Sequence, residues 1–68
     1  MKLTNQQFLE VCGLATQLKA ETPELRIGQA LFNALYMTHR ELAKNVIETD
    51  ADPFYDDSRV KEFINFIL

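Results

Sequence analysis

The sequence predicts an all-α fold, with one domain over residues 1–68 made of four short helices and an acidic loop before the last helix. Apolar side chains recur at steps of three and four residues in four separate segments, which is the period of a helix buried on one face. No segment alternates apolar and polar residues as a half-buried strand does. Residues that cap or interrupt helices, mainly threonine, proline and aspartate, separate the four segments.

The first helix is expected over residues 5–20. Thr4 suits the N-cap, and Gln7 completes a capping box with it. Leu3 and Phe8 have the spacing of a hydrophobic staple around that cap. The apolar face of this helix is then Phe8, Val11, Cys12, Ala15 and Leu18.

The second helix is expected to follow Thr22 as N-cap, with Pro23 in its first turn, and to run to about residue 37. Its apolar residues occupy most of its circumference: Leu25, Ile27, Ala30, Leu31, Phe32, Ala34, Leu35 and Tyr36. A short helix that is apolar on most sides is usually central and packed on two sides.

Two shorter helices complete the prediction. Thr38 and Glu41 have the spacing of a second capping box, which would start a third helix that ends near Glu48. Ser58 or Asp57 can cap the fourth helix. The apolar positions are Leu42, Ala43, Val46 and Ile47 in the third helix, and Val60, Phe63, Ile64 and Ile67 in the fourth.

The net charge of −3 is concentrated in one segment. Residues 48–57 hold five acidic side chains and no basic one, whereas the segments on either side each have a net charge of +1. A general nucleic-acid-binding protein would have the opposite sign. A calcium loop that starts at Asp50 would place Phe54 and Tyr55 where a ligand and a glycine are needed, so no metal site and no cofactor are expected.

The acidic segment is better explained as a corner between two helices. Pro53 disfavours continuation of the third helix, and Asp56 and Asp57 lie where carboxylates cap the fourth. Phe54, and Tyr55 as the less clear case, are expected to pack against the second helix and hold the loop there.

Two stretches, "RIGQALFNALY" and "TDADPFYDDSRV", are similar to a set of small tailed-phage proteins that share an R-x-G-Q-x-x-x-N-x-L helix and a D-P-F loop. The resemblance extends from Arg26 to Phe63, and it implies a phage setting without implying a mechanism. It draws attention to Arg26, Gln29 and Asn33, which share one stripe of the second helix, and to Gly28, where a backbone or a ligand could approach closely.

Three interpretations of this stripe remain open. In the first, Gln29 and Asn33 hydrogen-bond the backbone of the D-P-F loop, and Arg26 pairs with one of its carboxylates. In the second, the stripe is a recognition surface. In the third, it is merely a solvated face of the helix. The candidate partner-binding residues are therefore Asp50, Asp52, Phe54, Tyr55, Asp56, Asp57, Arg26, Gln29 and Asn33.

The residues predict a protein that is not an enzyme. No phosphate-binding, zinc-protease or serine-nucleophile motif is present. Cys12 lies on an apolar helix face and His39 in a capping turn, and one cysteine with one histidine cannot form a zinc site. A chain this short is marginally stable alone, and Phe66 lies off the main stripe of the last helix, so a homodimer is expected.

The leading functional hypothesis is a small phage-encoded interaction protein that binds a host or phage protein and modulates its activity, with inhibition as the favoured effect. The alternatives are a homo-oligomeric structural or accessory protein and an acidic mimic of nucleic acid. The chain has no apolar run long enough to span a membrane and no signal-peptide pattern, so the host cytoplasm is the expected location.

Overall fold

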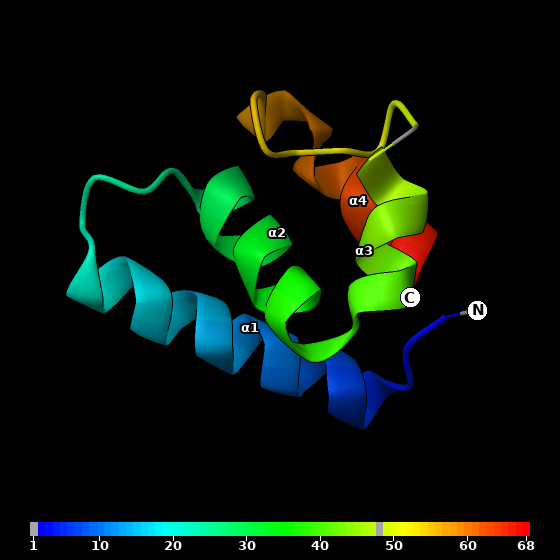
Figure 1. Cartoon of the computed structure of the whole chain (residues 1–68), viewed down its shortest axis with the longest axis horizontal. Coiled ribbons are helices and arrows are strands. Elements are labelled where there is room, and N and C mark those ends of the chain that lie inside the picture. The colour runs from blue at the N-terminus through cyan, green and yellow to red at the C-terminus, as the bar shows by residue number, and fades with distance from the viewer. Residues whose placement is uncertain (1, 48) are drawn as a thin grey trace.

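Helix α2 (Ile27–Thr38) lies at the centre of the fold, with α1 (Asn5–Glu21) on one side and α3 (Arg40–Ile47) and α4 (Val60–Ile67) on the other (Figure 1). The structure, a computed structural model, describes residues 2–47 and 49–68. Over these residues it contains no strand, which confirms the predicted all-α class. The predicted end of the third helix near Glu48 lies outside the described residues.

No helix in the described part of the chain is long and apolar enough to cross a bilayer.

Helix α1 begins as the sequence predicts. The Gln7 backbone N–H donates to Thr4 Oγ1 at 3.1 Å, and the Thr4 backbone N–H donates to Gln7 Oε1 at 2.9 Å, which together form the capping box. The predicted apolar face is also confirmed, because Val11 and Ala15 are buried. Its other members, Phe8, Cys12 and Leu18, are partly buried against the core.

The predicted start of the second helix is wrong. Thr22 is instead the C-cap of α1, where its N–H donates to Leu18 O, and α2 begins only after Arg26. The Leu25 N–H donates to Thr22 O at 3.0 Å, which makes the intervening residues a turn. The local T-P-E signal does not start the helix, because the groups that cap α2 are Gln29 and a carboxylate from the acidic loop.

The expected caps of the last two helices also differ from the structure. Thr38 is the last residue of α2, where its hydroxyl donates to Ala34 O at 2.8 Å, so it forms no capping box with Glu41. A 3-10 helix (Asp57–Arg59) precedes α4, and Asp56 is its N-cap in place of Asp57 or Ser58.

The core lies between α2 and the helices on both of its sides, as expected for a central helix. Phe63, Leu35, Leu42, Ile67, Val11 and Val46 are its largest fully buried apolar side chains. The accessible area is 4350 Å², close to the roughly 4,400 Å² typical of a folded monomer of this mass.

Phe66 is partly buried against this core, so the observation that led us to expect a dimer through α4 is weakened.

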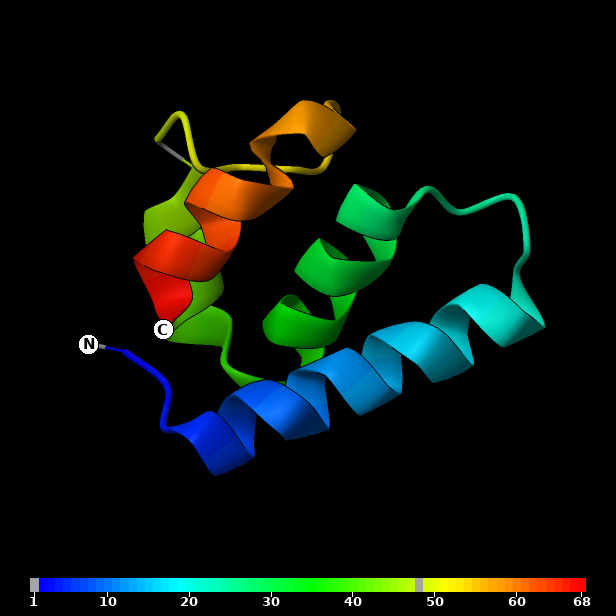
Figure 2. The same ribbon diagram turned by 180° about the vertical axis from the view of Figure 1, so that it is seen from behind.

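The two ends of the described chain lie side by side (Figures 1 and 2). The Leu3 backbone N–H donates to Ile67 O at 2.7 Å, and Lys2 Nζ donates to Asn65 O at 3.1 Å. Leu3 is itself buried in the core. The extended segment before α1 is thus attached to the last turn of α4.

Candidate functional site: the acidic loop

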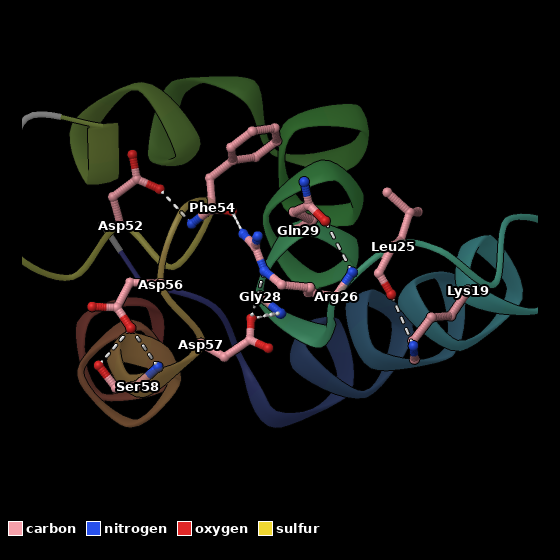
Figure 3. Close-up of polar contacts among 10 residues, drawn as sticks. All are labelled: Lys19, Leu25, Arg26, Gly28, Gln29, Asp52, Phe54, Asp56, Asp57 and Ser58. Atoms are coloured by element: carbon pink, nitrogen blue, oxygen red, sulfur yellow. Dashed lines mark hydrogen bonds and ion pairs between the residues drawn. The ribbon is translucent and has the colours of Figure 1, made fainter.

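The segment Thr49–Asp57, called the acidic loop below, follows α3, ends at the first residue of the 3-10 helix and passes close to the first turn of α2 (Figures 1 and 3). Thr49 starts it by donating both its N–H and its hydroxyl to Val46 O, at 3.0 and 2.9 Å. Pro53 is fully buried and Ala51 nearly so. The middle of the loop is therefore fixed to the body of the protein.

Gly28 lets the loop come this close. A Cβ atom at this position would lie 2.2 Å from Pro53 O and 2.8 Å from Asp57 Oδ1. Because real Cβ atoms do not approach a backbone oxygen so closely, any other residue would displace the loop. The close backbone approach expected at this glycine is confirmed.

Arg26 and Asp57 complete the attachment. The Gly28 backbone N–H donates to Asp57 Oδ1 at 3.0 Å, and Arg26 Nε lies 3.6 Å from the same oxygen. The Arg26 guanidinium also donates to the carbonyl oxygen of Phe54 (Figure 3). We call Arg26, Gly28 and Asp57 the clasp. It confirms the expected pairing of Arg26 with a loop carboxylate.

Each remaining aspartate of the loop also has an intramolecular contact. Asp52 Oδ1 accepts from the Phe54 N–H at 3.0 Å, and Asp56 Oδ1 accepts from the N–H and the hydroxyl of Ser58 at 2.9 and 2.6 Å (Figure 3). Arg59 lies 3.5 Å from Asp50 and 3.7 Å from Asp56. Arg26 and Arg59 therefore balance part of the local negative charge. The pairing of Arg59 was not predicted from the sequence.

The hydrogen bonds from Ser58, helped by Arg59, hold the pKa of Asp56 below its ordinary value. These donors favour the ionised carboxylate, so Asp56 stays charged at and well below neutral pH.

The two amides of the predicted stripe do not reach the loop backbone. Gln29 Oε1 accepts from the Arg26 N–H at 2.9 Å, so Gln29 caps its own helix. Asn33 is half-buried on α2, and no side-chain hydrogen bond joins it to the loop within residues 2–47 and 49–68. The expectation that Gln29 or Asn33 holds the loop is therefore wrong, and the side chain that bonds the loop backbone from α2 is Arg26, which donates to the Phe54 carbonyl.

Four aromatic rings form a continuous row across α2 and the loop. The ring centroids of Tyr36 and Phe32 are 6.2 Å apart, those of Phe32 and Phe54 5.8 Å, and those of Phe54 and Tyr55 4.8 Å. Phe54 is half-buried against α2, as predicted. Tyr55 does not pack against α2 and is 84% exposed, so the structure corrects that expectation.

Tyr55 lines two surface cavities. Their volumes are about 220 and 450 Å³. Ile47, Asp52 and Tyr55 line both of them. Ile47 was expected on the apolar face of the third helix, yet it is 49% exposed and lines both cavities. The residues Ile47, Asp52, Tyr55 and Asp56 are called the Tyr55 surface below.

A second, more apolar surface lies elsewhere, in a groove of about 590 Å³ between α1, α2 and the start of α4. Phe8, Ala15, Ile27, Leu31, Val60 and Ile64 supply most of its apolar lining. Cys12 also lines this groove, and burial raises the pKa of its thiol. Ile27 is 53% exposed beside it.

The groups that could carry chemistry are dispersed. Cys12 lines the apolar groove, whereas His39 lines a different cavity with Lys2 and Arg40. Within the described residues, no group of three or more histidine, cysteine and carboxylate side chains is arranged to hold a metal ion. Comparisons with protein-family models, with curated proteins and with solved structures find no match for this chain.

Proposed function

We propose that this chain is a small interaction protein that binds another protein through the Tyr55 surface and inhibits it. The observation that carries the proposal is the exposure of Tyr55, which is 84% accessible although the loop beneath it is firmly attached. Large exposed aromatic side chains are the residues most enriched among binding hot spots. The phage resemblance of the helix and loop supports a host or phage protein as the partner, met in the host cytoplasm.

The clasp supports this proposal because it restricts the loop before any partner arrives. Arg26 and Asp57 hold the loop from one side, and the Phe54 ring supports Tyr55 from below at 4.8 Å. A loop whose backbone is held in this way loses little conformational freedom on binding, which favours affinity.

Self-association is the second candidate, and the apolar groove supports it. A groove of about 590 Å³ next to the exposed Ile27 offers apolar surface that a second copy could cover. Light scattering over a range of concentrations tests this: a mass of twice 7.9 kDa that Ile27→Asp returns to the monomer supports a dimer. A monomer at every concentration contradicts it.

A third candidate, mimicry of nucleic acid, has less support. Asp52 and Asp56 accept hydrogen bonds from nearby backbone N–H groups. Asp57 pairs with Arg26 and Asp50 with Arg59, so part of the negative charge is balanced within the chain.

Affinity capture from host lysate tests the leading proposal. Wild-type protein, Tyr55→Ala and Leu9→Ala are compared, since Leu9 is an exposed apolar side chain (63%) on α1, which belongs to a different part of the surface. We expect a partner that wild type and Leu9→Ala retain and Tyr55→Ala loses. A partner retained equally by all three proteins would contradict the role of Tyr55, provided that circular dichroism shows each variant folded.

A further inference from the structure

We propose that the Tyr55 surface binds a basic segment of its partner, with an arginine side chain seated over the Tyr55 ring between the carboxylates of Asp52 and Asp56. This inference rests on the function proposed above and names the chemistry of the partner.

The Tyr55 ring offers an exposed aromatic face to a ligand. Tyr55 is 84% exposed, so a large part of its surface is open to a ligand, and the residue lines two surface cavities. The face of an aromatic ring attracts cations, and a guanidinium also stacks on it. The apolar side chain of Ile47 lines both cavities, where it can cover the methylene groups of a long basic side chain.

The carboxylates near Tyr55 favour a positively charged ligand. Asp52 lines both cavities and Asp56 lines the larger one. Asp52 uses Oδ1 for the Phe54 N–H, and Asp56 uses Oδ1 for Ser58, so the hydrogen bonds that shape the loop fix both groups in place. A carboxylate held by backbone donors is ready to accept further charge-assisted bonds from an arginine without first becoming ordered.

The same chain shows this mode of contact elsewhere. Arg40 Cζ lies 5.1 Å from the centroid of the Tyr36 ring, at the other end of the aromatic row. Tyr36 thus already has its cation, while Tyr55 remains the more exposed of the two rings.

Arg59 is a nearby positive charge whose removal should strengthen binding of a basic segment. It lines the larger cavity, lies 3.7 Å from Asp56, and its side chain is 42% exposed. An incoming arginine meets Arg59 as a like charge and as a competitor for Asp56. Removal of the Arg59 charge is therefore expected to strengthen binding of a basic segment, and removal of the Asp52 charge to weaken it.

The experiment measures binding of short labelled peptides by fluorescence anisotropy. The peptides share one sequence in which the same positions hold arginine, lysine or glutamate. The proteins are wild type, Tyr55→Ala, Asp52→Asn, Arg59→Gln and the control Leu9→Ala. Asn at position 52 keeps an oxygen that can accept from the Phe54 N–H, so the loop turn is preserved.

We expect the arginine peptide to bind best, the lysine peptide less well and the glutamate peptide least. Loss of the ring in Tyr55→Ala is expected to weaken arginine-peptide binding by about fivefold or more. Asp52→Asn should weaken it by about threefold, Arg59→Gln should strengthen it by a similar factor, and added salt should reduce all of these differences. Leu9→Ala should bind as wild type does.

The inference is overturned if no peptide binds, if the arginine and glutamate peptides bind equally, or if Tyr55→Ala binds the arginine peptide as wild type does. Tightening in Arg59→Gln also separates a direct contact from a merely structural role, since damage to the loop would weaken binding. If Arg59→Gln does not fold, the Asp52→Asn and Tyr55→Ala results decide.

Failure of this inference can be told from failure of the proposed function. If lysate yields a partner that depends on Tyr55 while the arginine peptide does not bind, the surface binds a protein of another chemistry. If the peptides behave as expected but no lysate protein depends on Tyr55, the proposed function is overturned.

Discussion

Asp57 accepts a hydrogen bond from the backbone N–H of Gly28 at 3.0 Å, although the two residues are 29 positions apart in the sequence. Helix α2 therefore receives a carboxylate at its N-terminus from the loop that it supports, where the helix dipole favours negative charge. The same oxygen lies 3.6 Å from Arg26 Nε. The start of the helix and the position of the loop are thus stabilised by the same contacts.

Gly28→Ala should destabilise the protein, and Gly13→Ala should stabilise it. A Cβ at position 28 would meet Pro53 O at 2.2 Å, whereas one at position 13 has no neighbour within 4 Å. We expect a loss of about 2–3 kcal/mol in the free energy of unfolding for Gly28→Ala, and a gain of about 0.5–1 kcal/mol for Gly13→Ala. Urea unfolding of both variants beside wild type measures the contrast. Equal effects at the two positions would contradict the close contact at Gly28.

Arg26→Gln should lower the free energy of unfolding by about 1–2 kcal/mol, because it removes a charge-assisted bond to the Phe54 carbonyl and a half-exposed ion pair. Arg26→Lys keeps the charge but cannot contact the carbonyl and Asp57 together, so an intermediate loss is expected. Thermal unfolding with Lys44→Gln as control tests this, since Lys44 forms an exposed surface pair with Glu41. Equal melting of the Arg26→Gln and Lys44→Gln variants would argue against the clasp.

The two aromatic residues of the loop should differ in their effect on stability. Phe54→Ala is expected to cost about 1–3 kcal/mol, less than for a fully buried ring, because Phe54 is only half-buried against Phe32. Tyr55→Ala should change the free energy of unfolding by about 0.5 kcal/mol or less, as expected for an exposed side chain. Chemical unfolding of the two variants under the same conditions gives the comparison. A large loss for Tyr55→Ala would show that the ring is part of the fold.

The lowered pKa of Asp56 predicts an effect of acid on stability. A carboxylate whose pKa is lower in the folded state than in the unfolded state stabilises the fold above the unfolded value, near the ordinary 3.8. This contribution is lost as the pH falls through the lowered pKa. Carbon-13 NMR titration should show Asp56 titrating below 3.8, and Ser58→Ala should move its pKa upwards. An unchanged pKa in Ser58→Ala would contradict the assigned cause.

The presence of four helices and most of their buried positions could be predicted because they depend on local information, although Ile47 is exposed. The capping box of Thr4 and Gln7 and the apolar spacing of α4 both act within a few residues. The start of α2 could not be predicted in this way, since Asp57 caps it from a distant part of the chain. Local signals at Thr22 and Pro23 were outweighed by a tertiary contact that no spacing rule reveals.

Contacts of the site could be predicted where a single residue type requires them. They could not be predicted where several neighbouring side chains are able to form the same hydrogen bond. Gly28 implied a close backbone approach, and the structure shows one. Arg26, Gln29 and Asn33 could each have bonded the loop carbonyl, and only the long arginine side chain does so. The exposure of Tyr55 was missed because an aromatic residue beside Phe54 has the same sequence signal whether it faces inward or outward.

The bond from the Leu3 N–H to Ile67 O, at 2.7 Å, has a consequence for how the molecule opens. It joins residues near the two ends of the described chain, so this amide can exchange its hydrogen with solvent only when the terminal segments separate. If α1 detached by itself, Leu3 would exchange faster than the amides in the middle of α2; if the helices open together, the rates would converge. Hydrogen exchange at this single amide therefore reports whether the fold is one cooperative unit.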